Sequence, residues 1–191
     1  KELKFKFSKP SFDILTEFSF VWEAEQQDRD WYRIHDLLRR LDYEEDNKTT
    51  RQAHEVLEKY YREKGEVAEA IYHANRLDWG KGVKEWVEEF KKALELSCYD
   101  ECRVLLEIRN ELVIQSDFWL GNVSKSEADY LETLAQYQKA EKEYLEAISS
   151  YNQALNRAPD YIIVSNNKGL ALAALGDLKA GLSQHQQAQN Y

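Results

Sequence analysis

The sequence is poor in proline, glycine and long apolar runs. It has two prolines and seven glycines in 191 residues, and the glycines are scattered singly. No glycine-rich phosphate loop of the form G-x-x-x-x-G-K-[ST] occurs, so this segment is not expected to bind or hydrolyse ATP by such a loop. No run approaches the ~18 apolar residues that span a bilayer, and the basic, aromatic start lacks the apolar core of a signal peptide. These absences predict a cytoplasmic chain with no membrane partner.

Positive charge and metal ligands are also scarce. The 26 basic and 35 acidic residues give a net charge of −9, which argues against nucleic acid as a partner. Cys98 and Cys102 are the only cysteines, and no histidine lies near them in the sequence. A metal site would need two further ligands, so we expect buried thiols and no metal. His54, His73 and His185 fall in different predicted helices and are expected to be packing or surface-edge residues.

What the sequence does contain is helical periodicity. From Asp36 onward the only proline is Pro159, and apolar residues recur at spacings of three and four, which predicts helix almost throughout. Residues 18–34 differ, because two aromatic and β-branched runs flank the polar stretch "EQQDRD", a pattern typical of a β-hairpin. The predicted fold is therefore mainly α. Residues 1–45 are predicted to be a winged-helix-like end that contains the small β-hairpin, and residues 46–191 to be helical repeats.

Small and aromatic residues repeat at a separation of 34 residues in the C-terminal part. The aligned pairs are Ala135 with Gly169, Ala147 with Gly181, Tyr151 with His185, and Ala154 with Ala188. This period, with a proline at position 159 closing the first copy, resembles the tetratricopeptide repeat, in which helical hairpins stack into a superhelix with a concave face. Residues 54–77 fit the same frame, and residues 83–115 are predicted to form a lengthened middle hairpin. We expect three full hairpins and a final one that ends in a partly exposed edge.

The stretch "RIHDLL" at residues 33–38 stands where the predicted strand gives way to a helix. Together with the preceding hairpin, it resembles the Met-His-Asp motif that closes the winged-helix domain of signal-transducing ATPases with numerous domains (STAND), including the NB-ARC proteins. Ile34 replaces the methionine, whereas His35 and Asp36 match. The resemblance implies that His35 contacts the β-phosphate of ADP and that Asp36 supports the turn. The alternative, from local chemistry alone, is that the pair is a structural helix start.

Three polar residues on a predicted repeat helix are candidates for ligand binding. In related repeats, Asn and Lys on the first helix of a hairpin hold a peptide backbone or carboxylate, and Asn166, Asn167 and Lys168 occupy such a helix. The alternative is a packing role. No G-x-S-x-G turn or carboxylate pair in a shaped cleft is indicated, so we expect no catalytic residues and no enzyme activity.

The family resemblance predicts a sensor or scaffold region of a multidomain signalling ATPase, whose repeats bind a protein or peptide effector. ADP or ATP would then bind through a module upstream of Lys1, and the chain would be a fragment of a longer protein. The segment itself is expected to hold no cofactor. The rival hypothesis is a free-standing tetratricopeptide adaptor that binds a partner peptide in its concave groove.

Overall fold

The computed structural model describes the backbone of residues 21–26, 29–34 and 48–189, and the side chains of residues 50–183. Contacts within the chain divide it into two units, Lys1–Thr50 and Arg51–Tyr191. In the first unit, strand β1 (Val21–Gln26) pairs antiparallel with strand β2 (Arg29–Ile34). The winged-helix assignment stays a prediction, and His35 and Asp36 lie outside the described residues.

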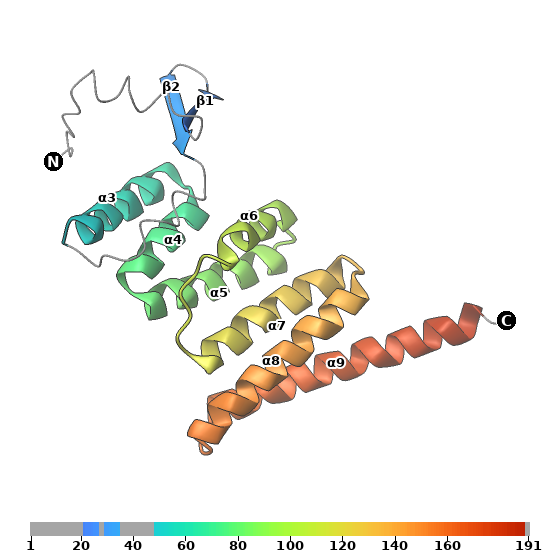
Figure 1. Cartoon of the computed structure of the whole chain (residues 1–191). Helices are drawn as coiled ribbons and strands as arrows, with labels where there is room; N and C mark the ends of the chain where they lie inside the picture. The colour runs from blue at the N-terminus through green and yellow to red at the C-terminus, as the bar shows by residue number, and fades with distance from the viewer. Residues whose placement is uncertain (1–20, 27–28, 35–47, 190–191) are drawn as a thin grey trace. The chain divides into compact units, whose positions relative to one another are not determined.

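Helices make up most of the described chain, which confirms the prediction of a mainly helical fold (Figure 1). Their bounds are α3 (Lys48–Lys64), α4 (Val67–Leu77), α5 (Trp79–Glu95), α6 (Tyr99–Arg109), α7 (Asp117–Thr133), α8 (Tyr137–Arg157) and α9 (Ile162–Gln189). Within the described residues, no helix is long and apolar enough to cross a membrane.

Three pairs of consecutive helices are joined by the same tight turn. α3–α4, α5–α6 and α7–α8 each turn on one residue of positive φ, namely Gly65 (75°), Ser97 (58°) and Ala135 (56°). The N–H of that residue bonds to the carbonyl three residues back, and the next N–H bonds to the carbonyl five residues back, with N···O distances of 2.8, 2.9, 3.0 or 3.1 Å. This is the Schellman motif, which satisfies carbonyls left open at a helix end and reverses the chain. The helices from α3 to α8 are therefore joined in pairs by one recurring turn.

The described helices bury three hydrophobic clusters, and Trp86 on α5 belongs to the largest of them. Its side chain is fully buried, its ring stacks on Phe90 at a centroid distance of 4.7 Å, and its Nε1 donates to the carbonyl of Leu105 on α6 at 2.8 Å. Tyr130 on α7 meets Phe90 edge to face at 5.9 Å, so the same cluster extends to the next hairpin. Burial of these rings ties α5, α6 and α7 into one body.

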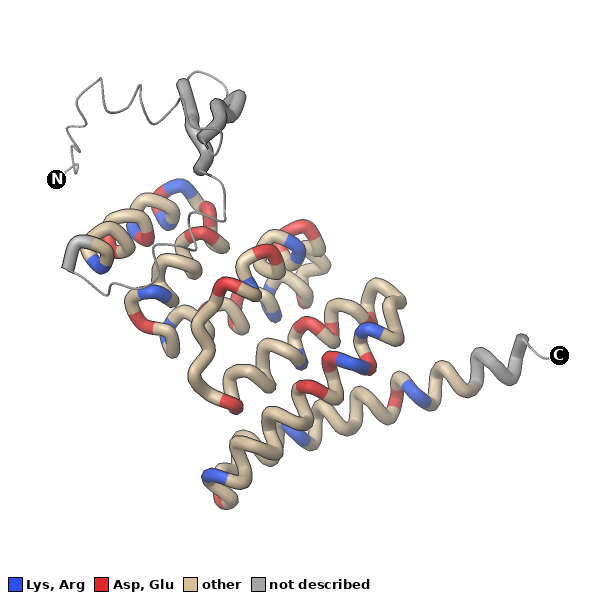
Figure 2. Tube along the Cα trace, in the orientation of Figure 1, with Lys and Arg blue, Asp and Glu red and all other residues tan. Residues whose placement is uncertain are grey.

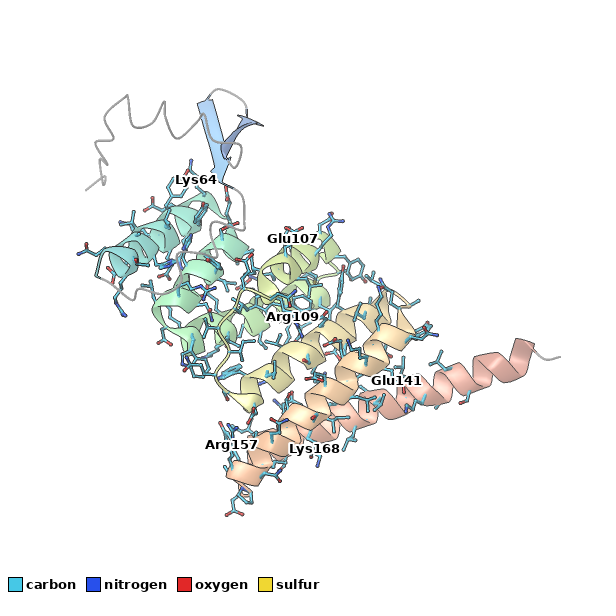
Figure 3. All side chains as sticks on the ribbon, viewed as in Figure 1. Lys64, Glu107, Arg109, Glu141, Arg157 and Lys168 are labelled. Atoms are coloured by element: carbon cyan, nitrogen blue, oxygen red, sulfur yellow. The ribbon has the colours of Figure 1, made fainter. Side chains whose placement is uncertain are left out.

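Arg109 at the end of α6 connects that helix to the α7–α8 hairpin (Figure 3). Its Nε lies 2.7 Å from Glu127 Oε2 on α7, and its Nη2 lies 3.5 Å from Glu143 Oε2 on α8. Burial raises the pKa of Glu127, and the positive charge of Arg109 opposes that rise. The arginine therefore compensates a carboxylate that packing has removed from water.

The prediction of a final hairpin is wrong. Residues 162–189 form a single helix, α9, of 28 residues. The 34-residue alignment paired Ala135, which has positive φ and makes the α7–α8 turn, with Gly169, which lies inside α9 and has no positive φ. The physical reason is a continuous apolar stripe, because buried residues on one face of α9 pack against α7 and α8 on both sides of Gly176. These residues are Val164, Ala171, Leu175 and Leu178.

Helix α9 also differs from the others in charge. Figure 2 shows acidic and basic residues interspersed along α3 to α8, whereas α9 is largely uncharged. Its sequence contains only Lys168, Asp177 and Lys179 as charged residues. Four apolar side chains of α9 are 48–72% exposed, namely Ile162, Ile163, Leu170 and Leu172. The expected exposed edge is therefore present as one face of a single helix.

Candidate peptide-binding site

The three residues predicted to bind a peptide lie near the start of α9, but their environments differ. Asn167 points into the helix stack, where its Nδ2 donates to Asn122 Oδ1 on α7 at 2.8 Å. Asn166 is exposed, and Lys168 is half-buried. None of the described acidic residues pairs with Lys168. Figure 3 places Lys168 on α9 beside α8. The structure therefore connects Asn167 to the interior and leaves Asn166 and Lys168 at the surface.

Asn122 joins three helices. Its Oδ1 accepts hydrogen bonds from Asn167 Nδ2 and from the hydroxyl of Tyr151 on α8, at 2.8 and 2.9 Å. Asn122 is 4% exposed and Tyr151 is fully buried. Burial, and secondarily the negative charge of Asp129, raise the pKa of Tyr151, so its hydroxyl remains a proton donor at neutral pH. We refer to Asn122, Tyr151 and Asn167 as the amide cluster.

A glycine makes the amide cluster possible. A Cβ added at Gly121 would lie 2.5 Å from Tyr151 Cε1, a distance at which the two helices could not remain in place. The missing side chain lets the tyrosine ring lie against the α7 backbone and brings its hydroxyl within reach of the next residue, Asn122. The local sequence "GN" at residues 121–122 thus positions both the ring and its acceptor.

A second polar group lies further along α7. The hydroxyl of Tyr144 is 2.8 Å from Asp129 Oδ1 and 2.7 Å from Glu132 Oε2, and Lys125 Nζ is 2.7 Å from Asp129 Oδ2. Burial, followed by the two carboxylates, raises the pKa of Tyr144. The single hydroxyl proton lies between two acceptors, and the lysine balances one of the two charges. Polar side chains at residues 122–132 therefore join α7 to both α8 and α9.

The amide cluster and Lys168 offer hydrogen bonding and positive charge. Side-chain amides donate and accept hydrogen bonds, which suits a peptide backbone, and a lysine without an acidic partner suits a carboxylate. Among the described residues, no group of three or more His, Cys, Asp or Glu side chains could hold a metal ion. Asn122 and Tyr151 are buried, so half-buried Asn167 and Lys168 are the members of this group that lie nearest the surface.

Sequence reasoning named Asn167 but missed its partner Asn122, 45 residues away. The signal that could have found Asn122 is a polar residue directly after a helix glycine in an otherwise small-residue stretch, "GNVS". His54 and His73 were placed in separate helices without a link between them, yet their Nδ1 atoms lie 2.8 Å apart. Of the two cysteines, Cys102 is buried as expected, while Cys98 is half-buried.

Comparison with known proteins adds no assignment: no protein-family model, no curated protein and no solved structure matches the chain.

Proposed function

We propose that residues 46–191 form a tetratricopeptide-like stack that binds a protein or peptide effector. The observation that carries this proposal is the recurrence of one Schellman turn at Gly65, Ser97 and Ala135, each between two consecutive helices. A helical hairpin of this size cannot bury its own apolar stripe, so hairpins stack and leave an extended surface of matching helices. Such a surface suits an extended peptide and carries no catalytic group in this proposal.

The proposed contact surface is the start of α9 with the adjoining part of α7. The amide cluster fixes Asn167 against Asn122, and this bond orients the asparagine side chain before a ligand arrives. Lys168 is the next residue, and its side chain is half-buried and has no acidic partner among the described side chains. A peptide whose carboxylate reaches Lys168, and whose backbone reaches the half-buried side chain of Asn167, would use both features.

The two lysines of α9 provide a matched test. Phage-displayed random peptides with free carboxyl termini would be selected on the protein, and the affinity of an enriched peptide measured by fluorescence anisotropy. Lys168→Ala should weaken binding about tenfold or more, because a hydrogen bond to a charged group contributes about 1.5–3 kcal/mol. Lys179→Ala is the control, since Lys179 pairs with Glu141 at 2.9 Å and should not affect binding. Equal affinity of both variants and the wild type would rule out this surface.

We further propose that the chain is the sensor or scaffold part of a cytoplasmic signalling ATPase of the STAND type, with His35 and Asp36 as its ADP-sensing pair. Support comes from the "RIHD" stretch after a strand pair and before helices. Calorimetric titration of ADP into the protein that carries an upstream phosphate loop should show weaker binding for His35→Ala. Unchanged ADP affinity, or a coding sequence that starts near Lys1, would instead favour the free-standing adaptor.

A further inference from the structure

A pocket of about 270 Å³ lies where α7 begins and α8 ends. Its lining includes three aromatic rings, from Trp79, Phe118 and Tyr161, and one charged pair, Asp117 and Arg157. The rings of Phe118 and Tyr161 have centroids 5.7 Å apart and meet at 42°. The volume is below the ~300–1,000 Å³ of sites that enclose a whole small molecule, so it suits a side-chain head group. Figure 3 shows Arg157 at the end of α8, near the start of α9.

The two charges of this pocket are held very differently. The Asp117 side chain is 17% exposed, whereas that of Arg157 is 73% exposed. Arg157 Nη1 lies 2.9 Å from Asp117 Oδ2, yet that oxygen is fully buried and receives a hydrogen bond from none of the described residues. The contact is thus an ion pair without an aligned N–H. The pocket contains a fixed anion whose present cation is exposed and replaceable, because solvent screens such a pair and makes it weak.

We propose that this pocket binds an alkylammonium group that carries methyl groups and retains at least one N–H, as at the end of a dimethylated lysine side chain of a partner protein. The N–H would donate to Asp117 Oδ2, which supplies the missing hydrogen bond and pairs the buried carboxylate. The methyl groups and the positive charge would lie against the aromatic rings, which attract cations through their faces. Arg157 would move outward into solvent.

The chemistry selects this class of ligand over its neighbours. A trimethylammonium group, as in choline, has no N–H and would leave Asp117 Oδ2 without a hydrogen bond. An unmethylated ammonium supplies N–H groups but is strongly hydrated and has little apolar surface to place against the rings. An anion would pair with Arg157 but would lie beside the buried Asp117 carboxylate, which repels it. A partly methylated ammonium satisfies both the carboxylate and the rings.

This inference goes beyond the proposed peptide site and rests on other residues. Phe118 and Asp117 lie about one helical turn before Asn122 on α7, so both sites could contact one partner. Failure of one does not entail failure of the other, because Lys168 takes no part in the pocket and Asp117 takes no part in the amide cluster.

The test uses Nα-acetyl-lysine methylamide in its unmodified, dimethylated and trimethylated forms. Choline is included as a trimethylammonium compound that is not part of a lysine side chain. Binding is followed by saturation-transfer NMR and by the upfield shift of the ligand methyl protons near aromatic rings. We expect the dimethylated form to bind most tightly. Asp117→Asn should weaken its binding about tenfold, through loss of a charge-assisted hydrogen bond. Arg157→Ala should strengthen it severalfold, because it removes the competing cation.

Tyr161→Ala should weaken binding about threefold, whereas Tyr137→Ala should leave it unchanged. The two tyrosines are 43% and 41% exposed, and Tyr137 does not line the pocket. Circular dichroism melts would show that the variants remain folded. The proposal is overturned if neither the wild type nor Arg157→Ala binds the dimethylated probe, or if Arg157→Ala weakens binding. Equal or tighter binding of choline, of the trimethylated or of the unmodified probe would also refute it.

Discussion

Replacing Gly121 with alanine tests the packing of α7 on α8. The new Cβ would lie 2.5, 2.7 and 3.0 Å from Cε1, Cδ1 and Cζ of Tyr151. That ring cannot move aside easily, because it is fully buried and its hydroxyl is held 2.9 Å from Asn122 Oδ1. Overpacking of this kind costs about 1–3 kcal/mol, and so close a contact places the cost at the upper end, about 3 kcal/mol. Alanine recovers about 1 kcal/mol of helix propensity, so we expect a net loss of about 2 kcal/mol.

Gly169→Ala is the matched control. Gly169 also lies inside a helix, but nothing is within 4 Å of the position that its Cβ would occupy. The same substitution should therefore stabilise the protein by about 0.5–1 kcal/mol through helix propensity alone. Urea denaturation followed by circular dichroism gives the free energy of unfolding of each variant. Equal free energies for the two variants would refute the close approach of α7 and α8 at Gly121.

Two further substitutions test other contacts. Asn75→Ala removes three hydrogen bonds, two of them with the backbone of Val113, and should lower the free energy of unfolding by about 2–3 kcal/mol. Asn152→Ala, on the exposed face of α8, should not lower it. Burial and the nearby charge of Arg76 lower the folded-state pKa of His54, so the unfolded chain binds more protons. The contribution of His54 to the free energy of unfolding should be fully present above about pH 6.5 and should be lost below it. The urea midpoint of the wild type should therefore fall between pH 7.5 and pH 5.5, and that of His54→Gln should fall by less. Equal midpoint shifts in both proteins would contradict the role of His54.

The helices could be predicted from the sequence because each has an apolar face that repeats at the helical period. Trp86 and Phe90, for example, are four residues apart and both fully buried. Turns were harder. Gly65 is a residue type that favours positive φ, but Ser97 and Ala135 adopt positive φ with side chains that disfavour it. Two Schellman hydrogen bonds accompany each of these turns, but the residue types serine and alanine give no sequence signal for them.

The wrong prediction of a hairpin at residues 162–189 also came from inferring turns from residue types. The 34-residue alignment matched small residues with small residues, which locates close helix contacts and not turns. The three turns that the structure shows lie at residues 65, 97 and 135, so the separations are 97 − 65 = 32 and 135 − 97 = 38. A fixed period cannot describe helices whose lengths differ from one hairpin to the next. The recurring unit is the Schellman turn with its two flanking helices, whatever their length.

Unequal helix lengths also explain where the pocket lined by Asp117 and Arg157 forms. α8 has 21 residues and α7 has 17, a difference of four, or about one helical turn. Since α7 ends and α8 begins at the turn at Ala135, the extra turn of α8 extends past the first residue of α7. That extra turn carries Ala154 and Arg157, which line the pocket together with Asp117 at the first position of α7. A hairpin of equal helices would lack this wall, so the departure from a regular repeat is what creates the site.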